Sequence, residues 1–239
     1  MVSPFSQFEI TVLQKINPIL DLSITNFTIY ITIITLITLG FYNLSINSAK
    51  LIPTNYQQII EIFYTFILSL VVEQTNKNGL RYFPILFFLF NFLLASNLLG
   101  LFPWSFTITA QIIFTAFLSL SFFSGWIIQG IIFLKQDFIR IFIPRGIPGW
   151  LLPLLVVIEI LSFLIRPLSL SIRLFANMLA GHILLFILAS SIFSLGIFGI
   201  LPFTFILAFL VLEIGICFLQ AYVFTILLAI YLSDSFKAH

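Results

Sequence analysis

The sequence predicts an all-α, polytopic membrane protein with about five membrane helices and one interfacial amphipathic helix. Hydrophobic residues fill 61% of its 239 positions and charged residues only 8%, whereas soluble domains carry about 25% charged residues. A helix needs about 20 apolar residues to cross a bilayer, and stretches of that kind recur along the chain. No repeat or low-complexity linker divides the sequence, so residues 1–239 are expected to form a single membrane domain.

The predicted elements begin after an N-terminal segment, residues 1–25. This segment lacks a basic region followed by an apolar core, so no cleavable signal is expected. The five predicted crossings are residues 26–48, 82–102, 107–134, 147–192 and 194–233. The last two are longer than a perpendicular crossing requires, so we expect a strongly tilted hairpin.

Residues 53–76 differ from these five regions. Their uninterrupted apolar run, residues 62–72, is bounded by Glu61 and Glu73 and is short for a crossing. We therefore expect an amphipathic helix at the membrane interface. The alternative is a sixth crossing.

The distribution of basic residues favours five crossings. With that count, one side of the membrane collects Lys50, Lys77, Arg81, Lys135, Arg140, Arg145 and Lys237. The other side keeps only Lys15, next to acidic residues. Because basic loops stay inside, we expect the N-terminus outside and the C-terminus inside.

Arg173 lies in one of the most apolar stretches of the chain. A charge at the bilayer centre costs about 2.5–3.5 kcal/mol on insertion scales, so an arginine there indicates a function. Glu159 and Arg166 precede it at intervals of seven residues. Because seven residues drift by only about 20° around a helix, the three side chains should share one face.

Small residues surround Arg173 on the same predicted face. Within about 60° of it at 100° per residue fall Asn177, Ser162, Ser169, Ala176 and Ala180. Small side chains allow close approach between membrane helices, so the strip can face a partner with one cation exposed. The alternative is an ordinary tight helix contact in which Arg173 pairs with a structural acid.

Further polar groups occupy the last two predicted helices. Glu213 and Gln220 are seven residues apart, and an antiparallel pairing would bring Gln220 towards Arg173 and Glu213 towards His182. Acids and a histidine on two sides of a fixed cation suit proton movement, because a carboxylate in low dielectric can load and release a proton. A permanent cation between them would block a continuous proton wire.

Other chemistry has little support. The single Cys217 excludes an intrachain disulfide and argues against a cysteine metal site. Phosphate-binding loops, HExxH motifs and nucleophile elbows do not occur. We therefore expect no metal, no cofactor, no nucleic-acid partner and no catalytic reaction by the chain itself.

Three motifs in order resemble subunit a of the rotary F-type ATP synthases. They are SLSIRLFANMLAGHILL, NLLGLFPWSFTITAQ and LEIGICFLQAYVFTILLAIYL, and the resemblance covers roughly residues 80–233. The combination of AGH with SFTITAQ is more similar to the mitochondrial branch than to the plastid branch, and the richness in Phe and Ile agrees with this.

This resemblance implies roles for the polar residues. Arg173 would release the proton from the carboxylate of a rotating c-subunit ring and separate two proton half-channels. Asn177 and Gln220 would orient it. His182 and Glu213 would line proton uptake from the outer side, and Glu159 would line release towards the matrix. For Arg166, a position where the family tolerates variation, the alternative is lipid-headgroup contact or packing near Pro167.

The resemblance also implies partners and a compartment. The partners would be the c-subunit ring, the peripheral stalk and other membrane-sector subunits. The location would be the mitochondrial inner membrane, with the bacterial plasma membrane as the alternative. A secondary transporter or small-ion channel with Arg173 as an anion site is the competing function, but the inverted repeats typical of transporters are not visible in the sequence.

Overall fold

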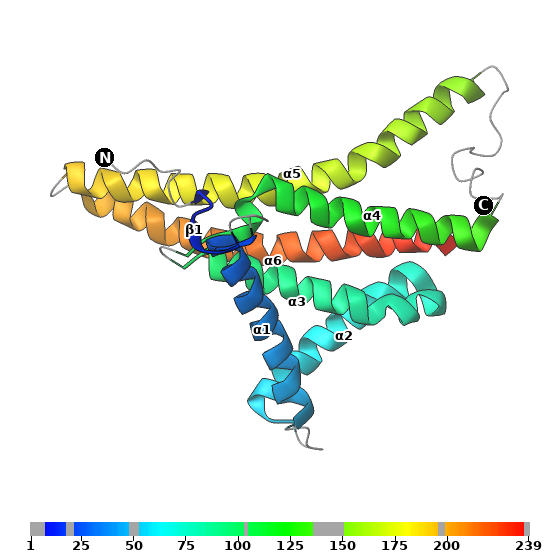
Figure 1. The fold of residues 1–239 in the computed structure, drawn as a ribbon, viewed down its shortest axis with the longest axis horizontal. Helices are drawn as coiled ribbons and strands as arrows, with labels where there is room; N and C mark the ends of the chain where they lie inside the picture. Colours follow the sequence, from blue (N-terminus) through cyan, green and yellow to red (C-terminus); the bar gives the residue numbers. More distant parts are fainter. Residues whose placement is uncertain are drawn as a thin grey trace.

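The computed structural model describes residues 8–17, 22–47, 53–102, 105–135, 151–195 and 199–236. Its main elements are six α-helices, which run along and across one long axis (Figure 1). They are α1 (Asn26–Asn47), α2 (Asn55–Thr75), α3 (Phe83–Gly100), α4 (Ile112–Leu134), α5 (Leu152–Leu195) and α6 (Ile200–Phe236). Short 3-10 turns, η2 (Asn76–Tyr82) and η3 (Ile108–Ala110), precede α3 and α4. The predicted all-α membrane fold is confirmed.

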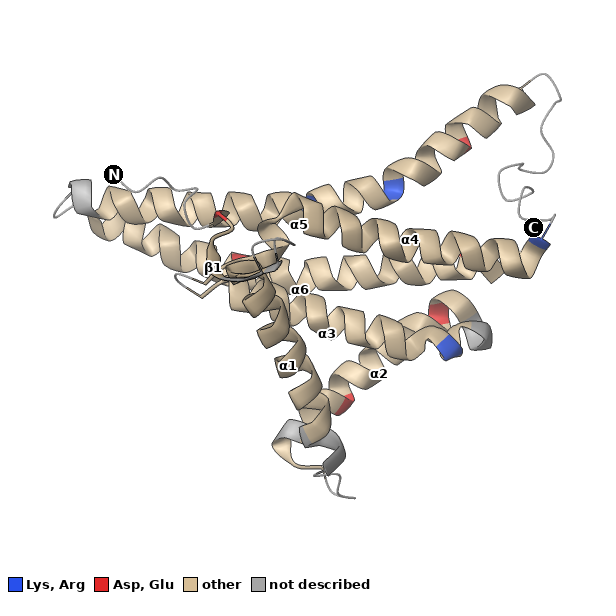
Figure 2. Cartoon of the chain, viewed as in Figure 1, with Lys and Arg blue, Asp and Glu red and all other residues tan. Residues whose placement is uncertain are grey.

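All six helices are long and apolar enough to cross a membrane. This includes α2, whose apolar window Gln57–Thr75 extends beyond the short run seen in the sequence. Length and composition thus give six candidate crossings, and the interfacial position of α2 stays a prediction. Charged residues are sparse on these helices, and α5 carries both signs (Figure 2).

Hydroxyl side chains in the helices bond to their own backbone. The Thr35 hydroxyl donates to the Ile31 carbonyl at 3.0 Å, and the Ser171 hydroxyl donates to the Leu168 carbonyl at 2.9 Å. Polar groups in hydrocarbon must find such partners. This local pairing lets the chain place serine and threonine within apolar helices.

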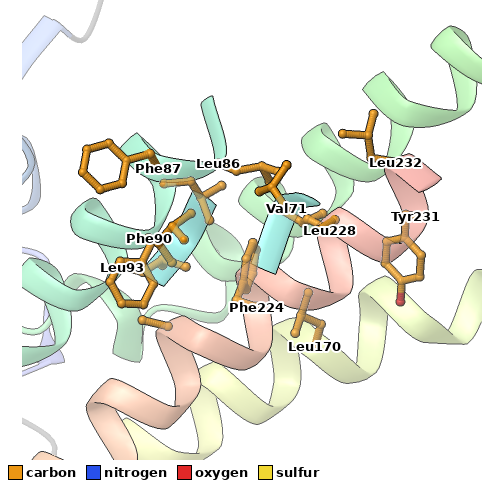
Figure 3. Packing of buried hydrophobic residues seen from close by; sticks show 14 of the residues in the cluster. Val71, Leu86, Phe87, Phe90, Leu93, Leu170, Phe224, Leu228, Tyr231 and Leu232 are labelled. Atoms are coloured by element: carbon orange, nitrogen blue, oxygen red, sulfur yellow. The ribbon is translucent and has the colours of Figure 1, made fainter. Parts of the chain in front are cut away.

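The C-terminal half of α6 forms the centre of the bundle. Phe224 and Leu228 of α6 are fully buried and lie among side chains from α2, α3 and α5 (Figure 3). The surrounding core includes Val71, Leu86, Phe90, Leu93, Leu170, Leu174 and Leu232. Beyond α3 and α4, α5 and α6 continue side by side as a two-helix hairpin (Figure 1).

Helix α5 changes direction along its length (Figure 1). Pro167 lies inside this helix, where its ring removes one backbone donor and clashes with the preceding turn, a common cause of kinks. The segment before Pro167 therefore diverges from α4 and α6. It carries Glu159 and Arg166.

The N-terminal region forms a short antiparallel strand pair, which the sequence did not indicate. Strand β1 (Val12–Asn17) pairs with β2 (Leu22–Thr25), and α1 follows at once. Residues 1–7 and 18–21 of the predicted N-terminal segment lie outside the described residues.

The predicted orientation stays a prediction. Four of the basic residues on which it depends lie outside the described residues, namely Lys50, Arg140, Arg145 and Lys237. Residues 147–150, at the start of the predicted long helix, also lie outside the described residues, as do residues 103–104 and residue 48.

Candidate functional site

Arg173 lies near the middle of α5 with its side chain exposed. Ser169, Ala176 and Ala180 are exposed with it, whereas Ser162 and Asn177 are half-buried. Among the described residues, the only ion pair on α5 joins Glu159 and Arg166, so no structural acid neutralises Arg173 there. The cation therefore faces outward from this chain.

A shallow apolar hollow continues the surface beside Arg173. It is lined by residues of α5 alone: Phe175, Ala176, Leu179, Ala180, Ile183, Leu184, Ile187 and Leu188. Two alanines that the sequence analysis placed in the strip thus border an open depression. The surface next to the cation is therefore apolar and open.

Asn177 and Gln220 connect the two long helices. The Asn177 side-chain amide donates to the Gln220 Oε1 atom at 3.3 Å. Gln220 is only 2% exposed, so this bond is protected from solvent. The bond lies one turn of α5 beyond Arg173. It joins the helix that carries Arg173 to α6.

Glu213 lies against Gly181, the residue before His182. A Cβ atom added to Gly181 would overlap the Glu213 carboxylate, so the missing side chain makes room for the acid. Glu213 is 4% exposed, and neither of its carboxylate oxygens has a hydrogen-bond partner among the described residues. The structure therefore brings Glu213 next to the position of His182, as the antiparallel pairing requires.

Other buried polar atoms lie on the elements around Glu213. His182 Nε2 also lacks a hydrogen-bond partner in the described part of the chain, as do Asn97 Oδ1, Thr107 Oγ1 and Thr109 Oγ1. Asn97 approaches α6 through a 3.5 Å bond from its amide to the Cys217 carbonyl. Buried polar atoms are normally hydrated when protein groups do not satisfy them, so water is expected to satisfy these atoms.

Glu159 and Arg166 form an ion pair on the diverging segment of α5. Arg166 Nη2 lies 3.7 Å from Glu159 Oε1, and both side chains are more than a third exposed. The pair lies on the side of Arg173 opposite His182 along the helix. Arg166 therefore has a specific partner, in addition to the packing or lipid contact expected from its position near Pro167.

Sequence reasoning missed several residues of this region. Asn97, Thr107 and Thr109 belong to one of the quoted motifs, and their polarity within apolar surroundings was the signal available. Gly181 belongs to the quoted AGH motif, but its contact with Glu213 could not be read from the sequence. The contact of Phe8 with His182 joins distant parts of the chain and could not be read from local spacing.

Together these observations define an integral membrane subunit. Its long helices carry ionisable groups, and the cation Arg173 lies on a surface that faces away from the rest of the chain. Comparison with known proteins supplies the family. The sequence profile of the ATP synthase A chain matches residues 27–233. The chain belongs to this family.

Individual relatives support the same assignment over the full length. The chain is 44% identical to ATP synthase subunit a of Dictyostelium discoideum over 244 residues, with 100% of both chains covered. It is 46% identical to ATP synthase subunit a of Acanthamoeba castellanii over 245 residues, with 98% of each covered. For Rhizobium johnstonii the identity is 43% over 243 residues, covering 97% of this chain and 96% of the relative.

Family membership fixes the general function. The chain is a proton-translocating stator subunit of the membrane sector of an F-type ATP synthase, and it has no catalytic site of its own. It works together with other subunits of that complex. This assignment excludes the competing function of a secondary transporter or small-ion channel with Arg173 as an anion site.

Proposed function

We propose that this subunit provides two offset proton half-channels, one on each side of Arg173, and that Arg173 faces the carboxylate of a ring of c subunits. The observation that carries the proposal is the position of Arg173. It is exposed and unpaired among the described residues, on a face with exposed small residues and an apolar hollow. A charged side chain in this setting needs a partner outside the chain.

The uptake half-channel contains His182 and Glu213. Glu213 is buried against Gly181, and its oxygens are free to accept protons or water. A proton arriving from the outer side binds this cluster and passes to the ring carboxylate. Protonation neutralises that carboxylate, which can then enter the lipid as the ring turns.

Arg173 acts at the boundary between the two half-channels. Its permanent charge favours the ionised form of a carboxylate brought next to it, so the ring acid gives up its proton as it arrives. The same charge repels a proton moving directly from one half-channel to the other. The bond between Asn177 and Gln220 holds the surface beneath Arg173 in one position and so orients the guanidinium.

The release half-channel contains Glu159. It accepts the proton that leaves the ring and passes it towards the matrix side. Arg166, at 3.7 Å, keeps the Glu159 carboxylate in place and partly balances its charge. The segment of α5 before Pro167 diverges from the bundle, and the side chain of Glu159 on it is 39% exposed, so water on the matrix side can reach its carboxylate.

The partners in this proposal are the c-subunit ring, the peripheral stalk and the other membrane-sector subunits. One charge crossing 100 mV releases about 2.3 kcal/mol, so several protons are needed for each ATP and a ring that adds steps is required. The compartment proposed is the mitochondrial inner membrane, with the N-terminus in the intermembrane space and the C-terminus in the matrix. The pairing of AGH with SFTITAQ, which resembles the mitochondrial branch more than the plastid one, and the richness in Phe and Ile support it; the bacterial plasma membrane is the alternative.

The proposal is tested by replacing Arg173 in the assembled complex. Arg173→Ala is expected to abolish proton-driven ATP synthesis while the subunit still copurifies with a ring of small hairpin subunits. Ser124→Ala, at an exposed position on α4 outside the strip, is the control and should keep its activity. Normal ATP synthesis in Arg173→Ala would overturn the proposal.

A further inference from the structure

Phe8 contacts the His182 side chain directly. The two ring centroids are 6.1 Å apart and the rings meet edge to face, at 79°. Phe8 is half-buried and packs against a small cluster of Ala110, Met178 and Cys217. One aromatic side chain from the N-terminal segment therefore contacts His182 of α5 and packs against a cluster whose members come from η3, α5 and α6.

The backbone around Phe8 is tied to the bundle at both ends. Gln111, immediately before α4, donates from Nε2 to the Phe8 carbonyl at 2.7 Å. Asn26, the first residue of α1, donates from Nδ2 to the Glu9 carbonyl at 3.0 Å and accepts from the Thr11 amide at 3.2 Å. The Asn26 amide in turn donates to the Thr11 carbonyl at 3.2 Å. Residues 8–11 are thus held in a defined position.

The Phe8 ring is a defined neighbour of the His182 imidazole. His182 Nε2 is buried and has no hydrogen-bond partner among the described residues, so no hydrogen bond within that part of the chain fixes the angle of this nitrogen. The Phe8 ring occupies one side of the imidazole and limits the rotation of its ring. Edge-to-face contacts of this kind have a preferred geometry.

We propose that residues 8–11 form a fixed cover over the His182 and Glu213 region, and that Phe8 is a positioning residue that holds the His182 imidazole for proton uptake. The inference rests on the proposed function, which places His182 and Glu213 in the uptake half-channel. Residues 8–11 lie outside the three motifs and reach the site only through the tertiary fold, and this inference gives them a role.

Few ionisable groups can influence His182 here. The elements packed around it contribute Glu213 and Cys217 from α6, and the cover itself contributes Glu9, which is exposed. Helix α4 and η3 contain no ionisable residue. A change in the pH profile on altering Phe8 therefore reports on the region of His182 and Glu213.

The test uses the assembled complex in membrane vesicles. Two quantities are measured: the rate at which diethyl pyrocarbonate modifies His182, read by peptide mass, and the pH profile of passive proton flux. Phe8→Ala is expected to increase the modification rate several-fold, to lower the flux several-fold and to displace its pH profile. Phe8→Tyr, which keeps the ring, should restore both quantities towards those of the original protein.

Val12→Ala is the matched control, because Val12 directly follows the cover and its side chain is 50% exposed. It should change neither quantity. If Phe8→Ala does not assemble, Gln111→Met, which keeps the side-chain length but removes the donor, tests the cover in its place and should act in the same direction. A modification rate and a pH profile unchanged in the assembled variant overturn the inference.

His182→Ala separates this inference from the proposed function. If His182→Ala lowers the flux but Phe8→Ala leaves it unchanged, only the positioning role of Phe8 is overturned. If His182→Ala leaves the flux unchanged, the proposed uptake role of His182 fails, and the positioning role fails with it. The double variant should match His182→Ala alone, because Phe8 acts through the imidazole.

Discussion

The carboxylate of Glu213 on α6 occupies the space that Gly181 leaves open on α5. This relationship joins the two long helices at the place where the chain also carries His182. A glycine allows close approach because it has no Cβ. The acid is therefore positioned by the absence of a side chain on the neighbouring helix.

Gly181→Ala should displace the Glu213 carboxylate, because the new Cβ would overlap it. A reacting group misplaced by about 1 Å can cost about 100-fold in rate, so we expect passive proton flux to fall by at least about tenfold. The control is Gly215→Ala on α6, where an added Cβ meets nothing within 4 Å. Equal flux in the two variants would show that this close approach has no functional role.

Glu213→Gln should slow proton uptake while preserving the packing, because the amide fills the same space but cannot carry the proton. The measurement is the rate of proton flux through the assembled membrane sector. Combined with Gly181→Ala, it should add little further loss, since both changes disable the same carboxylate. A fully additive loss would contradict this shared mechanism.

Parts of this site follow from the sequence, and the reason is helix periodicity. The seven-residue spacing of Glu213 and Gln220, with His182 and Arg173 on the preceding helix, predicted an antiparallel pairing, and the structure has Asn177 bonded to Gln220. The small residues around Arg173 were recognised in the same way. Apolar length alone predicted the α-helical membrane fold.

Other parts depend on contacts between distant segments. The Phe8 contact requires the N-terminal strand pair to return to the bundle, and neither has a local sequence signal. The bond from Gln111 to the Phe8 carbonyl has the same origin. The ion pair of Arg166 with Glu159 spans two turns, about 10 Å of helix rise, and depends on the extension of both side chains.

The bond between Asn177 and Gln220 should contribute measurably to the association of α5 with α6. Hydrogen bonds between membrane helices average about 0.6 kcal/mol and reach about 1.7 kcal/mol, and this one is buried on the Gln220 side. We expect a coupling energy in that range from a double-mutant cycle of Asn177→Leu and Gln220→Leu. The measurement is the denaturant stability of the purified complex, and a coupling energy of zero would show that the bond is not formed.

Glu159 and Arg166 should differ in functional effect although they form one pair. Because both side chains are more than a third exposed, the pair should contribute at most about 1 kcal/mol to stability. Arg166→Gln is therefore expected to leave ATP synthesis largely intact, whereas Glu159→Gln should reduce it several-fold by slowing proton release. Equal losses in the two variants would mean that the pair, and not the acid, is what function requires.

A bulky side chain on the strip beside Arg173 should interfere with the partner but not with the fold of this subunit. Ala176 and Ala180 are exposed and border the apolar hollow, so Ala176→Leu and Ala180→Leu need no internal repacking. If the strip faces the ring of c subunits, each change should reduce recovery of the ring with the subunit or slow ATP synthesis several-fold. The control is Ser124→Leu, at an exposed position on α4, which adds similar bulk elsewhere. If all three variants show the same loss, the cause is impaired membrane insertion. If neither alanine variant shows a loss, the ring of c subunits contacts another face of this subunit.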